Sequence, residues 1–332
     1  MTNALWLLLR RNTLRFLAAA MLGTVLAAPA QPQNAESEEL QTARQGLNLL
    51  MNGNPDAATR VFQKIQTEDS NSPLGYLLDA DATWWKIYLT TGNLIDPDVF
   101  DVGSSTTSPN DSHFEDLVNV AISKARANIN AKRNVARNYL YEGMAYGLRA
   151  RFAGMRDQAL AAAGAGNQMR SLLITALEKD KYLRDAYLGL GLYDYFVDTL
   201  PTFARIFRWF LGLPGGSRVK GLQEMEYAAK YGELTSGEAK FYLAKDYSRS
   251  SEKQYAKSLE LFRELEHEYP RNELWKLQIG SLEIRTGHSK EGEALYRQAL
   301  DETHGKQSEI EQAFHRAAKK ALERRHPEEK FE

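Results

Sequence analysis

Cysteine is absent from this chain of 332 residues. Its absence excludes disulfides, thiol catalysis, iron–sulfur clusters and cysteine-based zinc sites. The chain also lacks an excess of charge of either sign, because 42 lysines and arginines stand against 43 aspartates and glutamates. Proteins that bind nucleic acids usually carry a strong basic excess, so we expect no nucleic-acid partner.

Recognisable catalytic and metal-binding motifs are missing as well. The six histidines are scattered without helical metal-ligand spacing, and neither HExxH nor GxSxG occurs. The glycine turn at 213–216, with Ser217 as the predicted N-cap of the next helix, is not a Walker-type phosphate loop. We therefore predict no catalytic residue, no metal site and no cofactor, and expect the protein not to be an enzyme.

A long apolar run is lacking even at the amino terminus. Three arginines there precede an apolar segment of about 13 residues, 16–28, whereas a membrane span needs roughly 20. Ala28-Pro29-Ala30 follows with the small-x-small pattern of a cleavage site. We predict a signal peptide over 1–30 that is cut after Ala30. The mature protein would then be periplasmic or secreted, with no stable membrane span.

Other interpretations of this segment remain open. The apolar residues Leu5–Leu9 add length before the arginines, so an uncleaved membrane anchor is an alternative. Arg10-Arg11 also suggests a twin-arginine export signal, although Thr13 stands where that motif has an apolar residue. A cut after Ala28 is disfavoured because Pro29 would follow it directly.

Helical periodicity runs through most of the remaining chain. We expect a polar linker over 31–38, one helical domain over 39–325, and a frayed tail at 326–332. A helix of small residues, 156–178, is expected to allow close approach of its neighbours.

The segment 91–112 interrupts the helical pattern. It is rich in Gly, Pro, Asp, Ser and Thr and is predicted to be a long loop, which is unusual in a compact domain. Its aspartates Asp96, Asp98 and Asp101 lack the Gly and the terminal Glu of an EF-hand, so we expect no calcium site there.

A period of 34 residues relates 239–272 to 273–306 in the carboxyl-terminal third. Residues 39–72 fit the same pattern in part. The physical reason is packing, because small residues let two helices approach and large residues fill the remaining space. Equivalent positions pair Phe241 with Trp275, Phe262 with Tyr296, and Leu265 with Ala299.

This period, with two helices per unit, resembles the tetratricopeptide repeat. The segments Asp185–Tyr195, Leu200-Pro201 and Phe210–Gly216 look like a signature of a bacterial group of exported tetratricopeptide-repeat proteins. A more distant likeness is to the eukaryotic inclusion-body-clearance family of tetratricopeptide proteins. The resemblance implies an all-α superhelix of antiparallel helix hairpins that binds a protein or peptide on its concave face.

The stretch 183–232 is the predicted site. Pro201 and the turn at 213–216 insert an extra helix, 202–211, into this aromatic-rich region. Its arginines could hold a peptide carboxylate; alternatively, the rings pack helix on helix and the charges are solvated or paired. The proposed partner-binding residues are Tyr187, Tyr193, Asp194, Tyr195, Arg205, Arg208 and Trp209.

Three functions are therefore considered from the sequence. The first is a non-enzymatic periplasmic or exported scaffold that binds a protein or peptide. The second is a carrier that holds an apolar small molecule or a lipid-like ligand in the aromatic centre. The third is an enzyme of unrecognised type, whose sign would be histidines and carboxylates gathered in one cleft.

Overall fold

The computed structural model describes residues 32–96, 107–199, 214–329 and 331, with side chains from residue 38 onward. The predicted signal peptide, the middle of the 91–112 loop and the inserted helix 202–211 lie outside the described residues. Arg205, Arg208 and Trp209 therefore lie outside them too. The chain divides into two units, 1–38 and 39–332, and the description below concerns the second.

The second unit is all-α, and no strand occurs in the described ranges. Each helix has the length of three to six turns that is usual in globular proteins. The helices are α1 (Pro32–Met51), α2 (Pro55–Glu68), α3 (Leu74–Thr91), α4 (Asp111–Asn130), α5 (Val135–Met155), α6 (Ala159–Lys179), α7 (Ala186–Thr199), α9 (Arg218–Tyr231), α10 (Ser236–Ser248), α11 (Tyr255–Glu268), α12 (Glu273–Arg285), α13 (Ser289–Thr303) and α14 (Glu309–Arg325).

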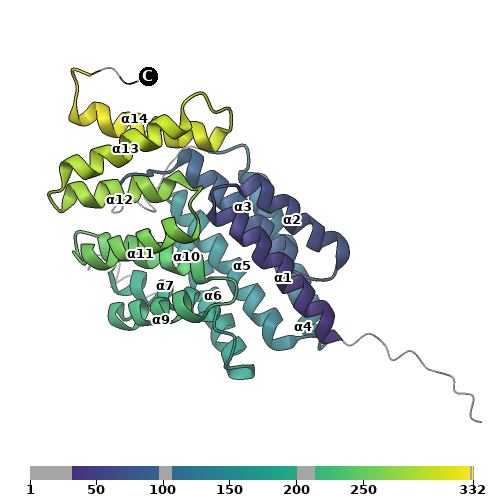
Figure 1. The fold of residues 1–332 in the computed structure, drawn as a ribbon. Coiled ribbons are helices and arrows are strands. Elements are labelled where there is room, and N and C mark those ends of the chain that lie inside the picture. The colour runs from purple at the N-terminus through teal and green to yellow at the C-terminus, as the bar shows by residue number, and fades with distance from the viewer. Residues whose placement is uncertain (1–31, 97–106, 200–213, 330, 332) are drawn as a thin grey trace, which may run out of the picture. The chain divides into compact units, whose positions relative to one another are not determined.

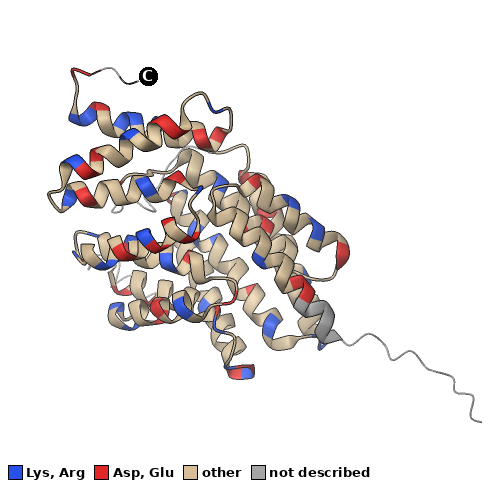
Figure 2. Cartoon of the chain, viewed as in Figure 1, with Lys and Arg blue, Asp and Glu red and all other residues tan. Residues whose placement is uncertain are grey.

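Consecutive helices pack side by side along the chain, as expected for a helical repeat. Figure 1 shows α11, α12, α13 and α14 lying one beside the next, and extensive contacts join α5 to α6 and α7 to α9. The sequence-based prediction of an all-α fold built from packed helices is confirmed. Blue and red segments alternate along α11–α14 in Figure 2, so neither sign of charge dominates these helices.

The 34-residue period has a clear structural counterpart. Tyr255 and Ser289, the first residues of α11 and α13, are 34 positions apart. The three pairs of equivalent residues predicted from the sequence are all buried. The ring centroids of Phe241 and Trp275 lie 5.8 Å apart, so the first helices of the two units share one aromatic core.

Two boundary predictions were wrong. α1 begins at Pro32, inside the expected polar linker, because proline is well tolerated in the first turn, where its missing N–H has no intrahelical partner. The described residues of the expected frayed tail, 326–329 and 331, contact the last helices. Phe331 is buried beneath the Arg297 guanidinium, and the His326 ring contacts Glu293 at 2.9 Å.

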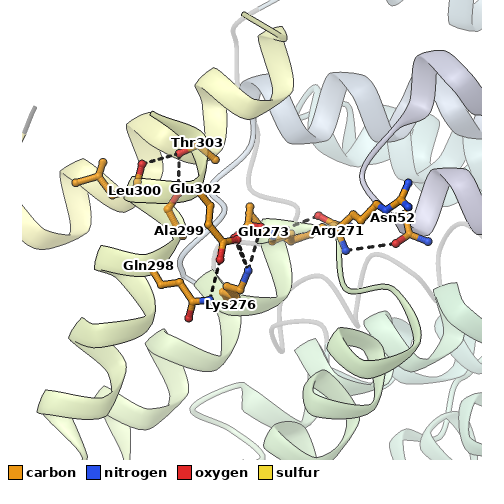
Figure 3. Close-up of polar contacts among 11 residues, drawn as sticks. Asn52, Arg271, Glu273, Lys276, Gln298, Ala299, Leu300, Glu302 and Thr303 are labelled. Atoms are coloured by element: carbon orange, nitrogen blue, oxygen red, sulfur yellow. Dashed lines mark hydrogen bonds and ion pairs between the residues drawn. The ribbon is translucent and has the colours of Figure 1, made fainter. Parts of the chain in front are cut away.

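Segments far apart in the sequence also touch, which a linear array of repeats does not predict. The Asn272 amide donates to the Met51 carbonyl at 2.9 Å. The Arg271 N–H donates to the Asn52 side chain at 3.3 Å, and Figure 3 shows this second contact. Asp96 lies in the loop that follows α3. It forms an ion pair with Arg285 at 2.8 Å. The amino-terminal hairpin is therefore packed against the carboxyl-terminal repeats.

Candidate functional site: an apolar cavity among five helices

A cavity of about 410 Å³ lies among α3, α5, α6, α7 and α10. This volume falls in the range of pockets that hold small molecules, roughly 300–1,000 Å³. Carbon atoms make up most of its walls. The apolar residues around it include Leu77, Leu148, Met169, Leu188, Leu192 and Phe196.

Small residues leave this volume open. A Cβ atom on Gly154 of α5 would meet no other atom within 4 Å, and one on Gly166 of α6 would meet only the Tyr193 ring, at 3.8 Å. Ala162 and Ala163 continue the same wall of α6. The small residues of α6 thus allow the extensive contact with α5, but in the first half of α6 no large side chain of the described residues lies against Gly154 or Gly164.

The other end of the same helix pair is closed. A Cβ on Gly143 of α5 would lie 2.7 Å from Leu173 of α6, and one on Gly147 would lie 3.0 Å from the Met169 sulfur. The helices α5 and α6 therefore pack tightly at one end, and the space between them is less well filled at the other. The cavity lies at the loosely filled end and reaches Gly147, Met169 and Leu173, where the tight packing begins.

A group of buried polar side chains forms one part of the wall. Arg151 of α5 donates to Asp81 of α3 at 3.2 Å, to the Tyr242 hydroxyl at 2.8 Å, and to Glu238 of α10. The guanidinium carbon also lies 4.7 Å from the centroid of the Trp84 ring, within the range of a cation–π interaction. We call Asp81, Arg151, Glu238 and Tyr242 the arginine cluster.

The arginine cluster contains two carboxyl groups and only one cation. Burial, together with the nearby Glu238 carboxylate, raises the pKa of Asp81 to about 8, and the charge of Arg151 only partly opposes this shift. Asp81 is therefore mostly protonated at pH 7. In that state the guanidinium pairs with Glu238 and the cluster carries no net charge.

Asp185 adds a third acid to the wall, but its role is structural. One carboxylate oxygen accepts from the Leu234 N–H at 2.8 Å, the Thr235 N–H at 3.0 Å and the Thr235 hydroxyl at 2.9 Å. These bonds fix the turn that begins α10, which carries Glu238 and Tyr242. Burial raises the pKa of Asp185, and the hydrogen bonds from Leu234 and Thr235 oppose that rise.

The described residues of the predicted site do not form one surface. Tyr193 lines the cavity, and its hydroxyl donates to the Pro214 carbonyl at 3.1 Å. Tyr195 is fully buried and donates to Glu252 at 3.3 Å. Asp194 is buried and pairs with Lys220 at 2.7 Å, and the Tyr187 ring packs against Tyr227 at 4.8 Å. Only Tyr193 among these four reaches the cavity.

Sequence reasoning missed the arginine cluster because its members come from three helices that are distant in the chain. Asp81 and Glu238 are separated by more than 150 residues, and neither belongs to a motif. The one usable signal was the run of alanine and glycine in residues 159–166, which was interpreted as close packing.

Within the ranges that the structure describes, no group of three or more His, Asp or Glu side chains is arranged to hold a metal ion. In the same ranges, no helix combines the length and the apolar character that crossing a bilayer requires. Comparison with protein-family models gave no match, and neither did comparison with curated protein sequences.

Proposed function

We propose that this chain is a non-enzymatic binding protein that holds an apolar small molecule or a lipid-like ligand in the cavity. The observation that supports the proposal is a cavity of about 410 Å³ with mainly carbon walls, made by five helices. Part of this cavity opens to solvent, so an apolar ligand that enters it removes carbon surface from water, which is favourable. Export by a signal peptide would place such a carrier in the periplasm or outside the cell.

The walls of the cavity suit an apolar ligand better than a peptide. A peptide brings backbone N–H and C=O groups that need partners when they are buried. The cavity offers few polar atoms, and those of the arginine cluster and Asp185 already bond to one another or to the α10 turn. An apolar chain or ring needs no such partners and gains free energy from leaving water.

Binding of an uncharged apolar dye, N-phenylnaphthylamine, tests the proposal. Ala163 lines the cavity, so Ala163→Phe would fill it and weaken dye binding at least tenfold. Ala161 lies on the same helix, is exposed and does not line the cavity, so Ala161→Phe is the matched control and should bind as the wild type does. A wild type that binds the dye no better than Ala163→Phe would refute the carrier function.

Native mass spectrometry of the purified protein gives a second measurement. A co-purified mass that is present in the wild type and Ala161→Phe, but lost in Ala163→Phe, would identify the natural ligand. This measurement does not depend on the choice of dye.

A protein partner is the second candidate function, and a different surface favours it. Tyr182, Tyr227 and Tyr231 are 68%, 38% and 42% exposed, and the rings of Tyr227 and Tyr231 lie 4.9 Å apart. Exposed tyrosines of this kind are typical of protein-binding surfaces. A pull-down from periplasmic extract should lose its partner with Tyr227→Ser and Tyr231→Ser together, and keep it with Val120→Ser on α4. Equal recovery of the partner by the double tyrosine variant and by Val120→Ser would exclude this surface as the binding site.

A further inference from the structure

The arginine cluster distinguishes among apolar ligands by the charge of their polar end. Both terminal nitrogens of Arg151 are engaged, one by Asp81 and the other by Glu238 and Tyr242. A ligand carboxylate would therefore have to share a terminal nitrogen of this guanidinium with Asp81, or with Glu238 and Tyr242. It would also bring an uncompensated negative charge beside Asp81 and Glu238.

The charged residues of the wall are mainly acidic. Within the part of the chain that the structure describes, three acids line the cavity, Asp81, Asp185 and Glu238, against the single cation Arg151. The side chains of Asp81, Arg151 and Glu238 are only 10–15% exposed, so solvent screens their charges weakly. A buried site with more carboxyl groups than cations accommodates a cationic ligand when one of its acids gives up a proton, because the site then stays neutral.

We propose that the cavity selects an amphiphile with an apolar body and a protonated amine, which pairs with the Asp81 carboxylate beside Arg151 and Glu238. This inference rests on the proposed carrier function and specifies its ligand class. The ammonium would donate to Asp81, and the aromatic wall, which includes Tyr193 and Phe196, would contact the adjoining carbon chain. Alcohols would bind more weakly, because they add no charge, and fatty acids would bind weakest.

Binding of the amine requires a proton to leave the site. The charged groups that act on Asp81 are Glu238 of α10 and Arg151 of α5, and the latter is also bound by the Tyr242 hydroxyl. Without a ligand, Asp81 holds a proton at pH 7, since burial raises its pKa to about 8. When an ammonium ion arrives, Asp81 ionises and releases that proton to solvent. The affinity for the amine should therefore rise from pH 6 to pH 8.

Three probes with the same ten-carbon chain test the selectivity: decylamine, decanol and decanoic acid. Isothermal titration at pH 7 should give at least tenfold tighter binding of decylamine than of decanol, with decanoic acid weaker again. Repeating the decylamine titration in buffers with different ionisation enthalpies should show release of close to one proton per ligand. Decanol should release none.

A substitution isolates the carboxyl group. Asp81→Asn removes the ionisable group but keeps a polar side chain of the same size, so the ratio of decylamine to decanol affinity should fall toward one. Asp116→Asn removes an acid from the exposed face of α4 and should leave that ratio as in the wild type. If Asp81→Asn does not fold, proton release by the wild type remains as the test.

The outcomes separate the two proposals. Binding of decanoic acid as tight as that of decylamine, or equal binding of decylamine and decanol without proton release, would overturn the amine selectivity and leave the carrier function standing. Failure of all three probes and of the neutral dye to bind would refute the carrier function itself, and the inferred selectivity with it.

Discussion

The hairpins α12–α13 and α5–α6 both contain glycines at their helix interface, but they use them differently. In α12–α13, a Cβ on Gly280 would lie 2.8 Å from the Tyr296 ring, so an aromatic side chain already fills the space. In α5–α6, a Cβ on Gly154 would meet nothing within 4 Å. Small residues therefore give close packing only where a large side chain faces them, and elsewhere they leave room for a ligand.

The α12–α13 and α5–α6 regions also differ in where their charged clusters lie. Lys276 donates to both oxygens of Glu273 at 3.0 Å and to Glu302 at 2.6 Å, as Figure 3 shows. Arg151 likewise holds two carboxyl groups. The Lys276 cluster ties α12 to α13 and its Glu302 side chain is 43% exposed, whereas the arginine cluster borders the cavity. The Lys276 cluster joins two helices, whereas the arginine cluster joins three helices at the wall of the cavity.

The largest expected difference between the regions comes from removing an aromatic ring. Tyr296→Ala should lower the free energy of unfolding by about 3–5 kcal/mol, because the ring is buried in a filled interface. Tyr193→Ala should cost about half as much or less, since that ring already borders a cavity. Urea unfolding followed by circular dichroism measures both. Equal losses at equal m-values would show that the two interfaces are filled alike.

Adding one carbon should have effects of opposite sign. Gly280→Ala should destabilise the protein by about 1–3 kcal/mol, because the new methyl group must displace the Tyr296 ring. Gly166→Ala should stabilise it by up to about 1 kcal/mol, because alanine favours the helix and the nearest atom is 3.8 Å away. Thermal unfolding of the two variants shows whether each substitution raises or lowers the stability. Destabilisation by Gly166→Ala would contradict the open packing described for this end of α6.

The sequence predicted the fold well where packing follows a short local pattern. The 34-residue period placed Phe262 and Tyr296 in the core, and Ser217 caps α9 as expected, with its hydroxyl accepting from the Lys220 N–H. Periodicity alone indicates which face of a helix is apolar, and in a repeat that face is covered by the next helix.

The cavity was less predictable, because alanine and glycine have the same helical pattern whether a neighbour fills the space or not. The contacts of Asn272 with Met51 and of Arg285 with Asp96 were also unpredictable, since nothing local signals a contact between residues about 190–220 positions apart. Polar groups such as Arg151 and Asp81 become partners only through the packing of whole helices. The residues proposed from the sequence therefore include Tyr193, which lines the cavity, but none of the arginine cluster.

The helix caps of the two regions should also contribute different amounts to stability. Asn272 is 3% exposed, accepts from the Leu274 N–H at 3.1 Å and also bonds to Met51, so Asn272→Ala should cost about 2 kcal/mol. Ser217 is exposed and makes only the local bond at 3.4 Å, so Ser217→Ala should cost about 0.5 kcal/mol. Urea midpoints with unchanged m-values would test this. A larger loss at Ser217 would mean that the central region depends on its caps more than on its packing.

The pH dependence of stability gives the most specific test of the comparison. Burial raises the pKa of Asp81 to about 8, whereas an unfolded aspartate titrates near pH ~4. Between these values the folded protein keeps a proton that the unfolded chain releases. The stability due to this group is therefore full below about pH 4 and is lost as the pH rises to about 8, with a slope of at most about 1.4 kcal/mol per pH unit.

Glu273 should behave similarly, but over a narrower range. Burial and a hydrogen bond with Glu302 raise its pKa to about 7, while bonds from Glu273 and Lys276 outweigh burial and lower the pKa of Glu302 to about 2. The free energy of unfolding of the wild type minus that of Glu273→Gln should thus stop changing near pH 7. The same difference for Asp81→Asn should keep falling until about pH 8. Measurements every half unit from pH 5 to 9 distinguish the two end points, and a common end point would contradict the higher pKa of Asp81 beside the cavity.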